Sequence, residues 1–230
     1  MIHCPTVLPP TVGCWRVGRV QEPYYEWRHP EKVDLRKSRA GNRFDSYLGN
    51  YGVLYFASSP EVCFAETLAR FRPKPSLATI AQREWTPNGW MLPGSIPADW
   101  RQKRLLTRVQ FVNPLPFLDI DSAETLAELQ AAPDLADDWT RMKVDEIDLA
   151  AVVGTDRRVT RRISQWAFEA VNDAGELRFG GIRYLSRLGA DYECWAVFEQ
   201  PEFAEVGRYP ILLSETAMQN VADRFGLTIH

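Results

Sequence analysis

Residues 51–67 read YGVLYFASSPEVCFAET, a strand sequence followed directly by a helix sequence. Residues 53–57 are a compact run of apolar, β-prone side chains, which is typical of a buried strand. Ser58 and Glu61 stand three residues apart, the spacing of a capping box, and Pro60 is tolerated in a first helical turn. We therefore expect a buried strand that leads straight into a helix.

The helix is expected to end near Phe71, because Pro73 follows it. Outward from this unit, apolar runs predict strands at 14–17, 105–112, 117–120, 177–185 and 192–199. Asp121 and Glu124 repeat the capping-box spacing and predict a helix to about Ala131. Two further helices are expected, from Thr155 to about Asn172 and from Ser214 to Phe225, the second closed by Gly226.

These elements mix strands and helices without a regular strand–helix–strand alternation, so we expect the α+β class. The chain has 230 residues, of which 45% are hydrophobic, enough to bury one sizeable core. We treat residues 1–230 as a single domain in which helices flank a small mixed sheet. No internal repeat or low-complexity tract divides it.

Charge and cysteine usage exclude several classes of protein. The formal net charge is −3, which argues against a protein built to coat nucleic acid directly. No stretch of eighteen apolar residues is present, so no membrane span is expected, and the start of the chain lacks a secretion signal. The four cysteines form no C-x-x-C pair, which is typical of free buried thiols in a reducing compartment, and we expect a cytoplasmic protein.

Familiar catalytic motifs are missing from the sequence. It contains no dinucleotide-binding glycine fingerprint, no P-loop and no G-x-S-x-G elbow. Its only histidines are His3, His29 and His230, of which two lie at the termini. A histidine-based triad or metal site would need better-placed residues, so we expect chemistry that uses carboxylates, arginines, tyrosines and hydroxyls, without a metal.

Three segments together carry a family resemblance. They are GNRFD at 41–45 with the strand at 51–57, the helix sequence at 58–67, and GIRYLSR at 181–187 followed by CWAVF at 194–198. In order and spacing they resemble the RES-domain family, the NAD-degrading toxins of bacterial toxin–antitoxin pairs. The likeness covers about residues 14–200 and leaves 201–230 as a C-terminal extension. One departure is Asp45, where the family often has asparagine.

The resemblance implies a fold like that of the ADP-ribosyltransferases and an enzyme that breaks the nicotinamide–ribose bond of NAD. Inorganic phosphate is the expected acceptor, which would make the protein an NAD phosphorylase. The alternative within the family is transfer of ADP-ribose to a protein target. An Xre-like antitoxin is the implied partner, and a homodimer is left open.

The resemblance also assigns roles to individual residues. Glu66 would stabilise the positive charge on the ribose as nicotinamide leaves, as carboxylates do in glycosidases. Arg43 would hold the pyrophosphate with its two-pronged guanidinium, and Ser186 would hydrogen-bond ribose or phosphate. Tyr55 or Tyr51 would pack against nicotinamide, and Arg183 would add positive potential near the dinucleotide.

Each of these residues also has a simpler interpretation. Glu66 stands four residues before Arg70, the spacing of a solvated ion pair on a helix. Arg43 lies in a polar loop, Tyr55 in a buried-looking strand, and Ser186 after a strand where a turn is expected. Arg183 and its neighbour Arg187 could be ordinary strand-end charges.

A third function class is a non-enzymatic binding module. In the helix after Thr155, apolar residues recur at helical spacing opposite a group of arginines: Arg157, Arg158, Arg161 and Arg162. Such a group is typical of a solvated helix face. A partner could also dock there, together with the tryptophan-rich segment that contains Trp85, Trp90 and Trp100.

Overall fold

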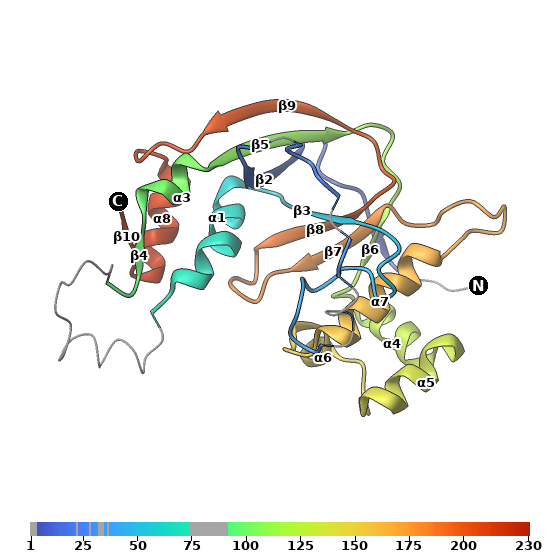
Figure 1. Ribbon diagram of the computed structural model, residues 1–230. Coiled ribbons are helices and arrows are strands. Elements are labelled where there is room, and N and C mark those ends of the chain that lie inside the picture. The colour runs from blue at the N-terminus through green and yellow to red at the C-terminus, as the bar shows by residue number, and fades with distance from the viewer. Residues whose placement is uncertain (1–3, 22, 28, 32–34, 36, 74–91) are drawn as a thin grey trace.

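A curved sheet of eight strands forms the centre of the computed structural model, which describes residues 4–21, 23–27, 29–31, 35, 37–73 and 92–230 (Figure 1). The strands lie in the order β1-β6-β7-β8-β3-β2-β5-β9. Within the described part of this sheet, β6 and β7 are parallel neighbours and the other pairs are antiparallel, so the sheet is mixed. In sheet order, the strands are β1 (Thr6–Val7), β6 (Phe117–Asp119), β7 (Gly181–Leu185), β8 (Glu193–Phe198), β3 (Val53–Ala57), β2 (Cys14–Arg19), β5 (Arg104–Phe111) and β9 (Phe203–Pro210).

Helices gather in two groups at opposite ends of the sheet (Figure 1). One group is α1 (Pro60–Leu68), which a short 3₁₀ turn (Ala69–Phe71) extends, with α3 (Ala98–Gln102) and α8 (Thr216–Phe225). Beside it lies a small parallel pair, β4 (Ser95–Ile96) and β10 (Thr228–Ile229). The other group is α4 (Ala123–Ala131), α5 (Pro133–Met142), α6 (Leu149–Val153) and α7 (Arg157–Glu169). This α+β architecture confirms the predicted class.

The sheet divides between β2 and β3. These two strands share a single register pair, Trp15 with Ala57, whereas β3 pairs with β8 at five positions and β2 pairs with β5 at six. Where β2 has left β3, the Arg16 guanidinium donates a 2.9 Å hydrogen bond to the Tyr55 carbonyl. The side chain therefore takes the place of a ladder bond and satisfies a backbone acceptor at the divergence.

Apolar side chains fill both faces of this sheet. The larger core lies among the helices and includes Phe64, Leu68 and Trp100. A smaller core on the other face is formed by residues from five strands: Cys14, Leu54, Phe56, Val109, Phe111, Phe117, Trp195 and Val197. Trp100 is 3% exposed and packs in the core rather than presenting a docking surface, while Trp85 and Trp90 lie outside the described residues.

Both predicted capping boxes are wrong by one residue at the cap. Ser59, not Ser58, caps α1, because its hydroxyl accepts from the Val62 amide. Ser58 is used elsewhere: it donates to Glu193 and accepts from the Trp195 indole at 2.9 Å.

At α4 the cap is Ser122, whose hydroxyl accepts from the Thr125 amide at 3.1 Å, rather than Asp121. The Asp121 carboxylate instead accepts from the Leu185 amide at 2.6 Å. At both helices, the residue expected to be the cap is held by a distant strand, and the adjacent serine caps the helix.

The arginines of α7 do not form the solvated face that their spacing predicts. Arg161 is fully buried and donates to the Lys37 carbonyl at 2.7 Å. Arg162 forms an ion pair with Asp138, which holds α7 against α5. α7 therefore uses its arginines to fix neighbouring loops and helices. No helix in the described part of the chain is long and apolar enough to cross a membrane.

Candidate active site

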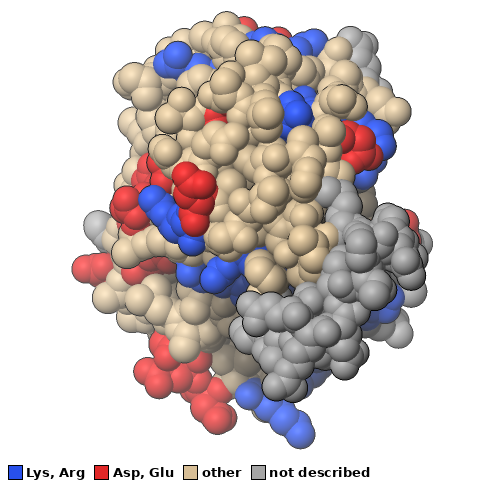
Figure 2. All heavy atoms as spheres, turned by 90° about the vertical axis from the view of Figure 1, so that its left-hand side faces the viewer, with Lys and Arg blue, Asp and Glu red and all other residues tan. Residues whose placement is uncertain are grey.

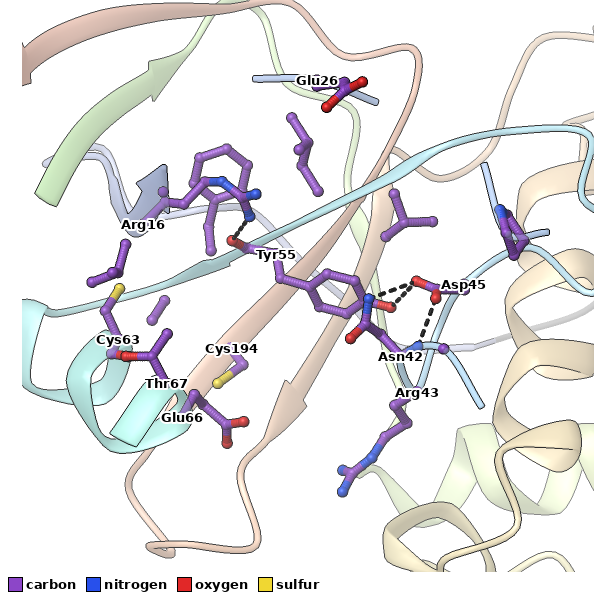
Figure 3. A pocket seen from close by; sticks show the side chains of 18 of the residues that line it. Arg16, Glu26, Asn42, Arg43, Asp45, Tyr55, Cys63, Glu66, Thr67 and Cys194 are labelled. Carbon is purple, nitrogen blue, oxygen red and sulfur yellow. Dashed lines mark hydrogen bonds between the residues drawn. The ribbon is translucent and has the colours of Figure 1, made fainter. Parts of the chain in front are cut away.

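A cleft of about 1070 Å³ opens where β2 and β3 diverge (Figure 3). Its described walls include β2, residues 23–27, 29–31 and 39–45, β3 and α1. This volume lies at the upper end of the range for small-molecule and cofactor sites. The cleft is therefore large enough for an extended ligand with several chemically distinct parts.

The loop that carries Arg43 is held by the carboxylate of Asp45. This carboxylate accepts from the Asn42 amide at 2.6 Å, from the Asn42 side chain at 3.3 Å and from the Tyr55 hydroxyl at 2.9 Å. Gly41 begins the turn at φ +66°, and a Cβ there would lie 2.8 Å from the Asp45 carboxylate. The positive φ favours glycine at this position, and a side chain there would crowd the carboxylate that holds the loop.

Helix α7 fixes the same loop from behind. Ser164 donates to the Phe44 carbonyl at 2.7 Å, and Thr160 donates to the Arg43 carbonyl. The Phe44 amide in turn donates to the Tyr55 hydroxyl at 3.0 Å. The backbone on both sides of Arg43 is therefore anchored before any ligand arrives.

The Arg43 guanidinium keeps an unused donor. Its central carbon lies 5.7 Å from the Tyr184 ring centroid, and its Nη1 atom is buried without a hydrogen-bond partner among the described residues. A buried donor without a partner costs free energy, so it commonly marks a position that a ligand or ion completes. Arg43 is therefore poised to bind an anion.

Glu66 lies on α1 at the other side of the cleft, and its carboxylate and the Arg43 guanidinium extend toward the same space (Figure 3). The Ser186 hydroxyl donates a hydrogen bond to the Glu66 carboxylate. Ser186 is 5% exposed, and its own hydroxyl oxygen accepts from the Leu188 amide at 3.0 Å. Among the described residues, no ion pair joins Glu66 to Arg70, whose guanidinium lies 4.9 Å from the Phe71 ring centroid.

Two tyrosines also line the cleft. Burial, together with the nearby charge of Asp45, raises the pKa of Tyr55 well above its ordinary value, so its hydroxyl stays protonated. Burial also raises the pKa of Tyr184, and the nearby charge of Glu66 adds to that effect. Both tyrosines therefore line the cleft as neutral aromatic residues.

Positive charge dominates the lining, although the whole chain carries a net charge of −3. Four acidic residues line the cleft: Glu26, Glu31, Asp45 and Glu66. Eight arginines line it: Arg16, Arg19, Arg39, Arg43, Arg70, Arg104, Arg157 and Arg187. On the face of the molecule seen in Figure 2, the described Lys and Arg side chains are scattered among uncharged and acidic residues. The cleft is thus a local site for a polyanion rather than part of a broad basic surface there.

Comparison with protein families gives a match to the RES domain over residues 14–216. The chain belongs to the RES-domain family. Among solved structures, it is similar to a chain of the Mycobacterium tuberculosis MbcT–MbcA toxin–antitoxin complex, with 10% identity and a TM-score of 0.46. That alignment covers 95% of this chain and 92% of the other. No curated protein matches the sequence.

Two residues predicted to bind ligand in this RES domain lie elsewhere. Tyr51 is 1% exposed, bonds Ser164 through its hydroxyl at 2.8 Å, and stacks on Phe168 with ring centroids 3.9 Å apart. It belongs to the core and is not among the residues that line the cleft. The expectation that Tyr51 faces the ligand is therefore corrected by its packing against α7.

Arg183 also lies away from its expected position near the dinucleotide. Its guanidinium forms ion pairs with Asp119 at 3.1 Å and Glu193 at 2.9 Å, and a longer one with Asp121 at 3.5 Å. It joins β7 to its two neighbouring strands and does not line the cleft. Trp195, on the neighbouring strand β8, is likewise buried in the smaller core.

The cleft of this RES domain is also lined by residues outside the predicted ligand-binding set. They include Tyr184 from β7, Arg187 directly after Ser186, and Arg157 from the start of α7. Strand alternation could have indicated Tyr184, because it lies two positions before Ser186 and so on the same face of an extended strand. In the described part of the chain, no three His, Cys, Asp or Glu side chains are grouped to hold a metal ion.

Proposed function

We propose that this RES-domain protein is an enzyme that cleaves the nicotinamide–ribose bond of NAD, with inorganic phosphate as acceptor. One observation carries the proposal. Arg43, with its unused donor, and Glu66, held by Ser186, come from distant segments and line one arginine-rich cleft. The family match and this geometry support the same chemistry, because a dinucleotide has an anionic centre and a reacting ribose that need these two types of group.

The carboxylate of Glu66 is suited to stabilising the positive charge that develops on the reacting ribose. As the bond to nicotinamide breaks, its electron pair leaves with the ring nitrogen and positive charge develops on the ribose. A fixed carboxylate next to that charge stabilises the transition state more than the ground state. The hydrogen bond from Ser186 keeps the carboxylate in one orientation, so little reorganisation is needed during the reaction.

The guanidinium of Arg43 is suited to binding the pyrophosphate. A guanidinium presents two parallel N–H groups that match two phosphate oxygens, and the loop backbone that carries it is already fixed. The flat, neutral Tyr55 ring offers a surface against which nicotinamide can pack. Tyr55 would thus serve twice, since its hydroxyl also holds the loop through Asp45.

A toxin role follows as part of the same proposal. An enzyme that consumes NAD stops growth, so a cell that makes it needs a protein that blocks the cleft. We accordingly propose a cognate antitoxin as partner. Expression of this chain alone should arrest growth, and co-expression of the antitoxin should restore it.

The decisive experiment is to incubate the purified protein with NAD, with and without inorganic phosphate, and to follow nicotinamide release by chromatography. We expect release that depends on phosphate, with ADP-ribose 1″-phosphate as the second product. Labelling of a protein instead would assign the chain to ADP-ribosyl transfer. Absence of release under all conditions would favour a binding module.

Glu66→Gln provides the matched test of the site. The amide keeps the shape of the side chain and removes its charge, so we expect a loss of at least about 100-fold in turnover with an unchanged melting temperature. Glu124→Gln, in the exposed first turn of α4, is the control and should keep full activity. Full turnover in Glu66→Gln would refute the proposed role of Glu66.

A further inference from the structure

Three arginines of the cleft lie together in a group that does not include Arg43. Arg19 ends β2 and Arg104 begins β5, and the two are direct register partners on neighbouring antiparallel strands. Side chains of such partners project on the same face of the sheet. Arg70, from the turn after α1, lines the same cleft.

This arrangement is unfavourable for the protein on its own. Like charges directly opposite on antiparallel strands destabilise the pair. Burial lowers the pKa of Arg104, and the nearby charges of Arg70 and Arg19 lower it further. The charges of Arg19 and Arg70 therefore both lie close enough to act on Arg104.

Direct ion pairs do not offset this repulsion in the described part of the chain. None of the ion pairs among the described residues involves Arg19, Arg70 or Arg104. Asp99, whose charge acts on Arg104, is bonded to Lys103 at 2.6 Å.

Arg104 is instead held by an aromatic residue. Its guanidinium lies 4.9 Å from the Trp100 ring centroid and donates to the Trp100 carbonyl at 3.0 Å. The positive charge is thus fixed in place and left without a counter-ion from the described residues.

The position of the group relative to Glu66 indicates its use. Arg70 follows Glu66 by four residues, which corresponds to about one helical turn and about 6 Å along the axis. Arg43 extends from another wall of the same cleft. An anion bound by Arg70 and its two neighbours would therefore lie near the reacting ribose and apart from the pyrophosphate held by Arg43.

We propose that Arg19, Arg70 and Arg104 form the binding site for the acceptor phosphate. The proposal rests on the proposed NAD cleavage and deepens it. A phosphate oxygen forms the new bond to the ribose carbon while the carbon–nitrogen electron pair leaves with nicotinamide. Hydrogen phosphate thereby becomes ADP-ribose 1″-hydrogen phosphate, whose remaining proton is lost to solvent. Three guanidinium groups match a dianion better than water or a protein side chain, so they select this acceptor.

Two variants test the site. Arg104→Gln and Arg19→Gln are each expected to raise KM for phosphate by about tenfold or more, with a smaller change in KM for NAD. Arg208→Gln, which removes an arginine from β9 outside the cleft, is the matched control and should leave both constants unchanged. Unaltered KM for phosphate in both cleft variants would overturn the proposal.

Thermal stability supplies a readout that does not need turnover. Arg19→Gln removes a like charge opposite Arg104, so the variant should melt above the wild type in phosphate-free buffer. Phosphate should raise the melting temperature of the wild type, and it should raise that of Arg19→Gln less. Chloride at equal ionic strength is the control. An equal phosphate shift in both proteins would overturn the site.

The outcomes separate this inference from the proposed function. If the wild type releases no nicotinamide, the proposed function fails, while the phosphate-dependent melting shift still tests the anion site. The 2′-phosphate of NADP has similar chemistry to free phosphate and is the other source to test. If the variants raise KM for NADP and leave KM for phosphate unchanged, the three arginines bind the 2′-phosphate of the dinucleotide instead. The assignment of the acceptor site would then be wrong.

Discussion

Ser186 donates a hydrogen bond to Glu66 across 120 residues of sequence, and this contact joins the strand β7 side of the cleft to helix α1. The Ser186 hydroxyl is fixed in turn, because it accepts from the Leu188 amide and its own amide donates to the Tyr192 carbonyl at 2.7 Å. The carboxylate is therefore oriented by a turn whose geometry is set by backbone hydrogen bonds.

Ser186→Ala should lower turnover without unfolding the protein. A hydrogen bond to a charged group contributes about 1.5–3 kcal/mol, so we expect kcat for NAD cleavage to fall by about 10- to 100-fold. Ser186→Thr keeps the hydroxyl and should retain most of the activity. The rate of nicotinamide release at saturating NAD measures kcat. Equal kcat in Ser186→Ala and wild type would show that Ser186 does not contribute to the reaction.

Arg43→Lys should mainly weaken NAD binding. The lysine keeps the positive charge and loses the two-pronged donor geometry, so we expect Kd for NAD to rise by about tenfold, with a smaller change in kcat. Calorimetric titration measures Kd directly. Arg208→Lys, on β9 outside the cleft, is the control. If both variants bind NAD as the wild type does, Arg43 does not hold the pyrophosphate.

Chelation should leave the reaction intact. The proposed mechanism uses the carboxylate of Glu66 and the guanidinium of Arg43 for charge stabilisation, so no metal ion is required. We expect the rate of nicotinamide release to change by less than about twofold after treatment with EDTA. Activity lost with EDTA and restored by a divalent cation would contradict this.

The strand and helix around residues 51–67 could be predicted because local signals agree there. The apolar run at 53–57 forms β3 with the predicted bounds, and Gly226 ends α8 in the left-handed conformation, at φ +64°. Such features depend on a few adjacent residues. By contrast, α5 and β9 were not predicted, because α5 begins only two residues after α4 ends and β9 has mostly exposed side chains.

Site residues could be predicted only where chemistry and motif coincide. Arg43, Tyr55 and Glu66 do line one cleft, with Ser186 bonded to Glu66. Tyr51 could not be told apart from Tyr55 by sequence, since both are tyrosines beside or within the same strand. Their difference arises from tertiary contacts, because α7 buries Tyr51 through Ser164 while Tyr55 is held by the Arg43 loop.

Tyr55→Phe tests whether the cleft depends on the loop network around Asp45. The wild-type hydroxyl donates to Asp45 at 2.9 Å and accepts from the Phe44 amide at 3.0 Å, so the variant leaves both groups without this partner. Loss of a buried partner costs about 1–3 kcal/mol, and the free energy of unfolding should fall by that amount.

The loop that carries Arg43 would then be less well fixed, while the aromatic surface for nicotinamide would remain. We therefore expect KM for NAD to rise by about three- to tenfold and kcat to change less, because Glu66 and Ser186 are untouched. Tyr24→Phe, at another tyrosine that lines the cleft, is the control for loss of a phenolic hydroxyl. Denaturant titration and steady-state kinetics measure the two effects separately. A destabilised Tyr55→Phe with unchanged KM would show that the network serves folding alone, because the Arg43 guanidinium would then find the pyrophosphate without it.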